Sequence, residues 1–584
     1  MASDVPVPAR NLRKDFLTRF MHLLLARREN LIVITILLIH FLLISPSLMP
    51  TFTEINSDDE AKYIESGWRL LNEGPRDLAW GPLVSLVYAP VHLLVGDSPS
   101  WFMIEAWVGR FLLFFLLWLS TYYLALQFKE YFHPLIAVGV LFISIYFLPV
   151  IENQSDALFV SMSAFALSRV IAYYRTQHLR DIGLASLFVG LGVLCRVETI
   201  LLVGTLAVIA LVIRRGRHGL LKVLSLSVVP AAVVLAVFIL TSLVTKGHLN
   251  LGISDKAFAS FEMNQPGQQT IESPGEDAGS PLITEDGSEG SIFRAIAGNP
   301  SAFIGRIFVH ALEQPGYFLD FYGKKLGPVL LLLSAWGIFT LVRRRSLTLL
   351  LILLIWPLHA LVSLAFFARH VVPQASYLPI ILSAVGIAEV FRPDIPRKDR
   401  VFLFLTALLI SFFSLLFDKP AILAGGLVLA AVLALTWLIQ PRQETTGSYA
   451  AIPLLILFAA GLILRGSYPF PNFPVLGSTV EEQAVTYIHQ EFDPLSKLLS
   501  TSSYPMLAAK MVAIDVQDVP VEVTSPQMLS DWLENQEIEG IYLDSRKNAR
   551  PEFVRVIESG LVEQFEVGYA SEDGAVRILI LKDP

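Results

Sequence analysis

The chain has 584 residues, of which 54% are apolar and 16% charged, and its mean hydropathy is +0.59. Soluble globular proteins are nearer one quarter charged (about 25%), so this composition is that of a membrane protein. The net charge of -7 is mild and no basic tract is present, which excludes nucleic acid as the expected partner. Cys195 is the only cysteine, which excludes an intrachain disulfide and a cysteine cluster for metal.

The first 30 residues are polar and basic, and an apolar run from Leu31 to Leu48 follows them. This run is long enough to cross ~30 Å of hydrocarbon. It closes with Ser-Leu-Met-Pro and lacks the short core and small-residue cleavage site of a signal peptide. We therefore expect a cytoplasmic segment of residues 1–30 and an uncleaved first membrane span.

An acidic sequence, Asp58-Asp59-Glu60, lies in the loop of residues 50–103 that follows the first span. Ser57 or Asp58 suits a helix N-cap. Asp59 and Glu60 then fall in the first turn, where negative charge interacts favourably with the helix dipole. The pattern predicts a helix that begins at this acidic sequence.

The helix that follows is predicted to be amphipathic and to lie along the membrane surface. Ile64, Trp68 and Leu71 recur at helical spacing and form one apolar face, and Gly74-Pro75 ends the helix. A second apolar segment, Leu83 to Val95, is too short to span the bilayer and is expected to be interfacial or re-entrant.

Twelve further apolar runs follow the first span in chain order. They lie near 104–126, 134–150, 157–174, 182–196, 198–213, 221–245, 326–342, 347–367, 371–391, 401–417, 421–439 and 450–464. We therefore expect about thirteen spans in a polytopic α-helical membrane domain of residues 31–465. Basic clusters at Arg214–Arg217, Arg343–Arg345 and Arg392–Arg400 all fall on one side, which places the N-terminus in the cytoplasm.

Two other long segments are expected outside the cytoplasm. Residues 247–325 contain an acidic stretch, Pro266 to Gly290, that is rich in Gly, Ser and Pro. Residues 466–584 have soluble character, with a helical pattern over 479–492 and short apolar strands at 540–543 and 576–581. We expect the latter to form a small C-terminal α/β domain.

The three acids at the start of the loop helix have two interpretations. They are either a solvated N-cap cluster, which is common at helix starts, or a site in which one carboxylate acts as a general base. Acids packed together raise at least one carboxyl pKa, because like charges disfavour joint ionisation.

Several motifs resemble those of the GT-C glycosyltransferases, in particular the protein O-mannosyltransferases and the aminoarabinose transferases. Asp59-Glu60-Ala61-Lys62-Tyr63 resembles the family's Asp-Glu-x-x-Tyr signature, and Trp80-Gly81-Pro82-Leu83 resembles its Pro-Leu after the first surface helix. Gly192 to Glu198 resembles the glycine-rich hairpin that ends in Arg, and Ala368-Arg369-His370 resembles the Arg-Tyr-x-x-Pro segment, with His370 in place of Tyr. The resemblance covers roughly residues 30–465.

The resemblance implies transfer of a sugar from a polyprenyl-phosphate or dolichyl-phosphate donor, with Asp59 as the candidate base. Asp58 is a neighbour that shares the role or replaces Asp59 if the register shifts by one, and Glu60 is assigned to support. The remaining candidates are polar or charged residues expected near the donor or acceptor: Tyr63, Asp156, Arg196, Glu198, Lys324, Lys325, Arg369 and His370.

Most of these residues also have a structural interpretation. Arg196 and Glu198 could form an ion pair within the hairpin, whereas Asp156 could be the N-cap of the next span. The two lysines could extend towards the lipid headgroups. Arg110 is interpreted as a contact inside the bundle.

The nature of a metal cofactor stays open at this point, because some GT-C enzymes use a divalent cation and many do not. The expected partners are the lipid-linked sugar donor, membrane lipids and an acceptor that is a glycan, a lipid or a protein. The alternative classes are a polytopic transporter and an envelope assembly protein without transferase activity. A transporter would show ionisable residues at mid-membrane and two related halves, and the sequence has no such repeat.

Overall fold

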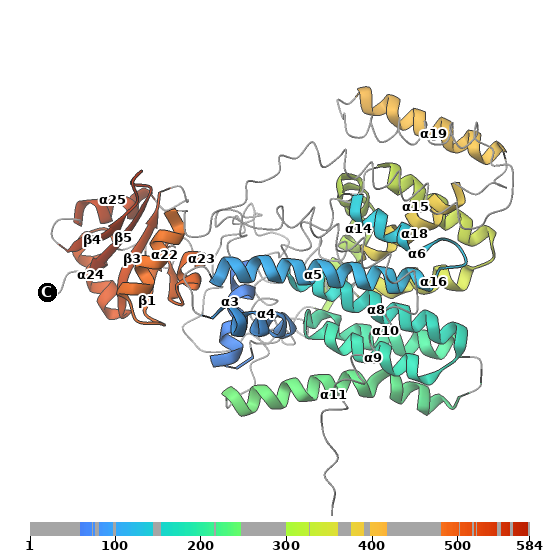
Figure 1. Ribbon diagram of the computed structural model, residues 1–584, viewed down its shortest axis with the longest axis horizontal. Helices are drawn as coiled ribbons and strands as arrows, with labels where there is room; N and C mark the ends of the chain where they lie inside the picture. Colours follow the sequence, from blue (N-terminus) through green and yellow to red (C-terminus); the bar gives the residue numbers. More distant parts are fainter. Residues whose placement is uncertain are drawn as a thin grey trace, which may run out of the picture.

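The computed structural model describes a helical bundle and a C-terminal α/β domain that packs against one end of it (Figure 1). The described residues are 59–72, 74–75, 81–96, 101–143, 154–214, 216, 218–246, 300–325, 328–359, 375–390, 397–416, 480–501, 503–516, 519–520, 523–545, 551–560 and 564–581. The expected spans at 31–48, 421–439 and 450–464 lie outside these residues.

The bundle is built from helices that follow the apolar runs of the sequence. Their bounds are α3 (Asp59–Asn72), α4 (Pro82–Val95), α5 (Trp101–Leu126), α6 (Pro134–Ile143), α8 (Gln154–Thr176), α9 (Leu179–Val193), α10 (Leu201–Val212), α11 (Leu220–Lys246), α14 (Pro300–Lys325), α15 (Pro328–Arg343), α16 (Leu347–Ile355), α18 (Tyr377–Val390) and α19 (Arg397–Leu416). A short 3₁₀ turn, Val197–Ile200, joins α9 to α10.

Three helices in the described part of the chain, α5, α8 and α11, are both long enough and apolar enough to cross a membrane. About thirteen spans were expected. Part of the difference arises because the expected spans at 182–196 and 198–213 are the helices α9 and α10, of 15 and 12 residues, which are short for a membrane span. Part arises because other expected spans, such as the one at 347–367, are only partly included in the described residues. The helices themselves occur in the predicted order.

Glycines permit the close crossings on which the bundle depends. A Cβ built on Gly190 of α9 would lie 2.8 Å from the Ala231 Cα of α11, so these two backbones are in direct contact. Gly337 of α15 and Gly386 of α18 meet the partner helix's backbone in the same way. Small residues therefore allow the helix backbones to approach closely here, as they do in membrane helix bundles.

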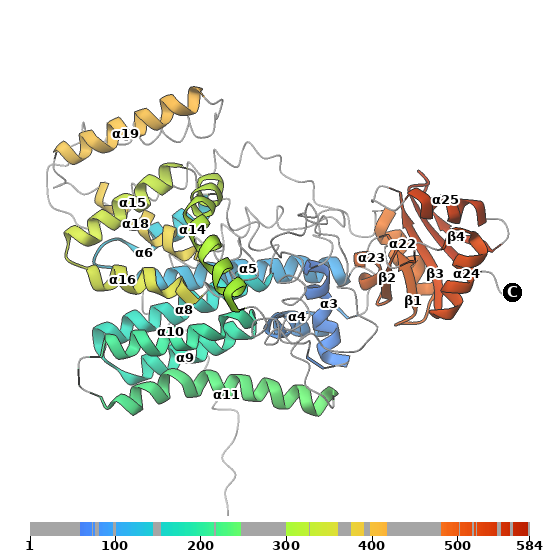
Figure 2. The ribbon, with the colours of Figure 1, turned by 180° about the vertical axis from the view of Figure 1, so that it is seen from behind.

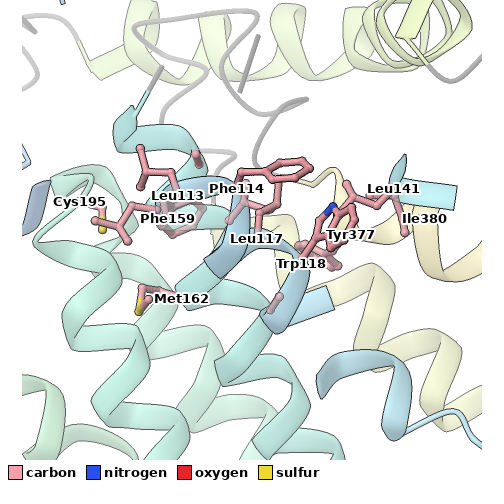
Figure 3. Close-up of a cluster of buried hydrophobic side chains, with 14 of the residues drawn as sticks. Leu113, Phe114, Leu117, Trp118, Leu141, Phe159, Met162, Cys195, Tyr377 and Ile380 are labelled. Carbon is pink, nitrogen blue, oxygen red and sulfur yellow. The ribbon is translucent and has the colours of Figure 1, made fainter. Parts of the chain in front are cut away.

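The buried core runs through the middle of the bundle (Figure 3). Phe114 and Trp118 of α5, Phe159 of α8 and Tyr377 of α18 all contribute to it. On the outside, large apolar side chains of α11 and α19, such as Val244 and Phe402, are exposed. An exposed apolar surface of this extent suits contact with lipid rather than water.

The C-terminal domain is a five-stranded mixed sheet with helices on both faces. Its strands are β1 (Lys497–Ser500), β2 (Val512–Asp515), β3 (Ile538–Asp544), β4 (Phe565–Ala570) and β5 (Val576–Leu581), in the order β2-β1-β3-β5-β4. Strand β1 is parallel to β2 and β3, whereas β5 is antiparallel to both β3 and β4. The predicted α/β domain, with its helix over 479–492 and its two strands, is confirmed.

Two layers of helix cover the sheet because its side chains alternate. Leu499 and Ile541 lie in the core shared with α24 (Pro526–Asn535) and α25 (Pro551–Gly560). Leu498 and Tyr542 point to the other face, with α22 (Val480–Glu491) and α23 (Ser503–Ala508). That second core is continuous with the core of the bundle, so the domain and the bundle share one apolar interior.

The segment 247–325 differs from its expected loop character. It ends in a helix of 26 residues, α14, in which Ile304, Phe308 and Leu312 are exposed apolar residues. The polar residues between these apolar side chains lower the mean hydropathy of the segment, so the sequence shows no continuous apolar run there.

Candidate functional site

The acidic sequence begins a helix, as its pattern predicts. Helix α3 starts at Asp59 and ends at Asn72, and Gly74 follows with a φ of +93°. That left-handed conformation suits glycine and ends the helix. Asp58 and the side chains of Asp59 and Glu60 lie outside the described residues, so their role stays a prediction.

The central part of α3 is enclosed by other elements of the protein, and its expected position along the membrane surface stays a prediction. Tyr63, Glu65 and Trp68 are all buried, with exposed fractions of 5%, 1% and 8%. Arg69 Nε lies 2.8 Å from Glu65 Oε1, which provides a partner for the buried carboxylate. The helix is enclosed because α4, α5 and the C-terminal domain contact it on several sides, as Figure 2 also shows.

Helix α4 is the element against which α3 and α5 pack. Tyr88, which is completely buried, rests on Gly67 of α3 and on Gly109 of α5. A Cβ on Gly67 would lie 2.6 Å from the Tyr88 Cβ, so no larger residue fits without a shift of one helix. The position of α3, and thus of its acidic start, is fixed through Tyr88.

The start of α4 is attached to the hairpin between α9 and α10. The Leu83 amide donates a hydrogen bond of 3.0 Å to the Leu194 carbonyl oxygen. Gly81 has a φ of +61°, and a Cβ there would lie 2.6 Å from the Cys195 carbonyl oxygen. The Trp-Gly-Pro-Leu motif therefore has a structural reason: Gly81 allows α4 to approach the hairpin turn that carries Arg196.

Arg196 forms an ion pair with Asp156. Arg196 Nε lies 2.5 Å from Asp156 Oδ1, and the two side chains are 13% and 10% exposed. Asp156 stands in the first turn of α8, which begins at Gln154, and so it is not the N-cap of that helix. The side chain of Glu198 lies outside the described residues.

This pair brings together two of the predicted site residues that are far apart in the sequence. A buried ion pair gains little net stability, because desolvation of both charges offsets their attraction. Such a pair is more informative about function, since an arginine near the membrane can exchange a carboxylate partner for another anion. A phosphate group presents the same bidentate acceptor geometry to guanidinium as a carboxylate does.

A second buried pair, between His92 of α4 and Glu105 of α5, was not predicted. His92 Nδ1 lies 2.6 Å from Glu105 Oε1, and the residues are 5% and 0% exposed. Trp101 packs edge-on against His92, with ring centroids 5.0 Å apart. The available signal was that two successive apolar segments contain ionisable residues, His92 in the first and Glu105 and Arg110 in the second, which are costly without partners.

The other candidates are placed less completely. Lys324 and Lys325 end α14, but their side chains lie outside the described residues, as do Arg369 and His370 entirely. Arg110 is buried within α5, in accord with its expected structural role. Among the described residues, no group of three or more His, Cys, Asp or Glu side chains is arranged to hold a metal ion.

The sequence matches no protein-family model and no curated protein. Solved structures do resemble it. ArnT from Cupriavidus metallidurans superimposes with a TM-score of 0.54 in the apo state and 0.56 when bound to undecaprenyl phosphate. Each match has 13% sequence identity and covers 94% of this chain and 97% of ArnT. This chain has the fold of ArnT.

The resemblance to the GT-C glycosyltransferases is thereby confirmed at the level of the fold. A weaker likeness connects the chain with the archaeal oligosaccharyltransferase AglB from Archaeoglobus fulgidus in complex with an inhibitory peptide and a dolichol-phosphate. It has a TM-score of 0.47 and 15% identity, and covers 93% of this chain and 74% of AglB. The likeness to ArnT includes the C-terminal domain, which the motifs left out, because it extends over nearly the whole of both chains.

Proposed function

We propose that this chain is a membrane glycosyltransferase that moves a sugar from a polyprenyl-phosphate donor to an acceptor at the membrane surface. The observation that carries the proposal is the likeness, over 94% of the chain, to ArnT bound to undecaprenyl phosphate. The Arg196–Asp156 pair supports it, because it supplies a partly buried guanidinium group, and guanidinium binds phosphate as well as carboxylate.

The proposed reaction is an inverting displacement. Asp59 removes a proton from the acceptor nucleophile, whose electron pair forms a bond to the anomeric carbon of the donor sugar. The bond from that carbon to the phosphate oxygen breaks, and the phosphate departs with the bonding electrons. Arg196 would stabilise the charge that develops on the departing phosphate. Asp58 is the alternative base, and Glu60 supports the loop.

The remaining predicted residues take secondary roles in the proposal. Arg369, His370, Lys324 and Lys325 are assigned to the donor phosphate and sugar. Asp156 holds Arg196 until the donor arrives. Tyr63 is buried in the core, so we assign it to the packing of α3 rather than to contact with the substrate. The side chain of Glu198 is kept as a candidate contact to the hairpin or the donor.

The topology is also part of the proposal. The N-terminal segment of residues 1–30 would lie in the cytoplasm, and the loops 50–103 and 247–325 with the domain 466–584 outside it. Transfer would then occur on the extracytoplasmic side of the plasma membrane, where the acceptor is a glycan, a lipid or a protein.

The test uses the full chain purified into proteoliposomes with a polyprenyl-phosphate sugar and an envelope fraction as the acceptor. Release of polyprenyl phosphate is measured by mass spectrometry. We expect Asp59→Asn to lower the rate by about 10² to 10⁴, the range typical of a general base. Asp58→Asn is the matched neighbour and should lower it less.

Full activity in both variants would overturn the assignment of the base. Failure of the wild-type chain to release the lipid phosphate from any of a panel of polyprenyl-phosphate sugars would overturn the proposed function itself. It would favour a transporter or an assembly protein.

A further inference from the structure

A buried lysine connects the C-terminal domain to the helix that begins at Asp59. Lys510 lies in the turn between α23 and β2, and only 5% of it is exposed. Its Nζ is 5.5 Å from the ring centroid of Trp68 on α3 and 5.6 Å from that of Trp101 on α5. We name these three residues the Lys510 cage.

The cage is reinforced by a hydrogen bond across the same boundary. Trp101 Nε1 donates to the Ala508 carbonyl oxygen, at 2.8 Å, and both groups are buried. The Trp101 ring also packs edge-on against His92, which is paired with Glu105. Trp101 is thus held from the bundle side and contacts the C-terminal domain through both its face and its N–H group.

The backbone conformation of Lys510 does not favour lysine. This indicates that the side chain is the reason for a lysine at this position. Its φ is +64°, in the left-handed region that glycine and asparagine adopt most readily. A lysine is strained there, and strain of this kind accumulates where a side chain serves a purpose. Burial of an ammonium group is also unfavourable unless the site stabilises its charge, which aromatic faces do.

Helix α3 connects this contact to the proposed active site. Trp68 stands nine residues after Asp59 on one continuous helix, a separation of about 14 Å along the axis at ~1.5 Å per residue. The first turn of α3 carries the acids, while its later turns are held by Tyr88 on one side and by Lys510 on another. A shift of the helix at Trp68 therefore moves Asp59 with it.

We propose that Lys510 is a positioning residue through which the C-terminal domain holds α3, and with it the candidate base, in register with the bundle. The proposal rests on the proposed function for its effect on the reaction. Its effect on α3 does not depend on that function.

The test compares four variants of the full chain in nanodiscs. Lys510→Met removes the charge and keeps most of the stem, whereas Lys510→Arg keeps a cation that stacks on aromatic rings. Lys510→Gly removes the side chain and relieves the positive φ, so the turn itself remains favourable. Lys497→Met is the matched control, because in the described part of the chain Lys497 donates hydrogen bonds within its own domain, to the Gln536 carbonyl oxygen and to Glu537.

Hydrogen exchange of the α3 amides is the first readout. We expect Lys510→Met and Lys510→Gly to speed exchange in residues 59–72 by about tenfold, the effect of losing one to two cation–π contacts in a buried site. Exchange in β1 and β3 should stay as in wild type. Lys510→Arg and Lys497→Met should match wild type in both regions.

Kinetics provide the second readout. In Lys510→Met, kcat should fall several-fold while KM for the donor stays unchanged, and Lys510→Arg should restore kcat.

The proposal would be overturned by α3 exchange that is unchanged in Lys510→Gly, or by α3 and the sheet accelerating together. The first outcome would show that the cage does not hold α3, and the second that Lys510 only stabilises its own domain. An inactive wild-type chain whose α3 exchange responds as expected would instead count against the transferase function and leave the positioning role supported.

Discussion

Two cations with little exposed surface, Arg196 and Lys510, have surroundings that differ in kind. Arg196 faces a carboxylate, Asp156, in the hairpin region of the bundle. Lys510 faces two indole rings at the boundary with the C-terminal domain. A phosphate can compete with a carboxylate for arginine, whereas the contacts of Lys510 with Trp68 and Trp101 join the C-terminal domain to the bundle. We therefore propose that Arg196 binds the donor phosphate reversibly and that Lys510 supports α3.

Of the two cations, Arg196 should show the larger effect on sugar transfer when it is substituted. Arg196→Gln is expected to lower sugar transfer by about 10² to 10³, because a donor to the developing phosphate charge is lost. Arg196→Lys should recover part of the rate, since it keeps the charge without the bidentate geometry. Rates of donor discharge in proteoliposomes measure both. If Arg196→Gln transfers at the wild-type rate, the arginine is only a structural partner of Asp156.

A smaller effect is expected from the contact that holds α4 against the hairpin. Gly81→Ala should lower transfer by about tenfold and destabilise the chain by ~1–3 kcal/mol, because its Cβ meets the Cys195 carbonyl oxygen and its φ is positive. Thermal unfolding and donor discharge measure the two effects.

Gly96→Ala is the matched control for this prediction. Gly96 also has a positive φ, +67°, but a Cβ there meets nothing within 4 Å. The substitution should show only the cost of backbone strain. Equal losses of activity in the two variants would mean that the approach of α4 to the hairpin has no part in the site.

The smallest effect is expected at the contact between Trp101 and the C-terminal domain. Trp101→Phe removes the hydrogen bond to the Ala508 carbonyl oxygen, a loss of about 1 kcal/mol. Faster hydrogen exchange in residues 503–508 should report it, while the affinity for undecaprenyl phosphate should stay unchanged. If Trp101→Phe also lowered the affinity for undecaprenyl phosphate, the separate roles of Arg196 and Lys510 would be contradicted.

Most helices of the bundle were predictable because they follow visible apolar runs, and the sheet of the C-terminal domain was predictable from its short apolar strands. The start of α3 at Asp59 and its end before Gly74 followed from capping chemistry alone. The burial of α3 was not predictable, since the partner that covers it at Lys510 lies far along the chain. Helix α14 was missed because its polar residues lower its hydropathy.

The site was predictable in its residues and less so in their pairing. Arg196 and Asp156 were both singled out, yet the sequence gives no means of telling whether Arg196 pairs with Asp156 or with Glu198. Such a pairing depends on how α8 packs on the hairpin. The His92–Glu105 pair was missed for the same reason, since the contact between the two residues depends on how α4 packs on α5.

The most direct test of the account is the affinity of the full chain for undecaprenyl phosphate, measured by native mass spectrometry in nanodiscs. If a lipid phosphate replaces Asp156 as the partner of Arg196, Asp156→Asn should bind the lipid several-fold more tightly than wild type, because the competing carboxylate is gone. Arg196→Gln should bind it at least about tenfold more weakly. Lys510→Arg should match wild type. Equal affinity in wild type, Asp156→Asn and Arg196→Gln would contradict the account.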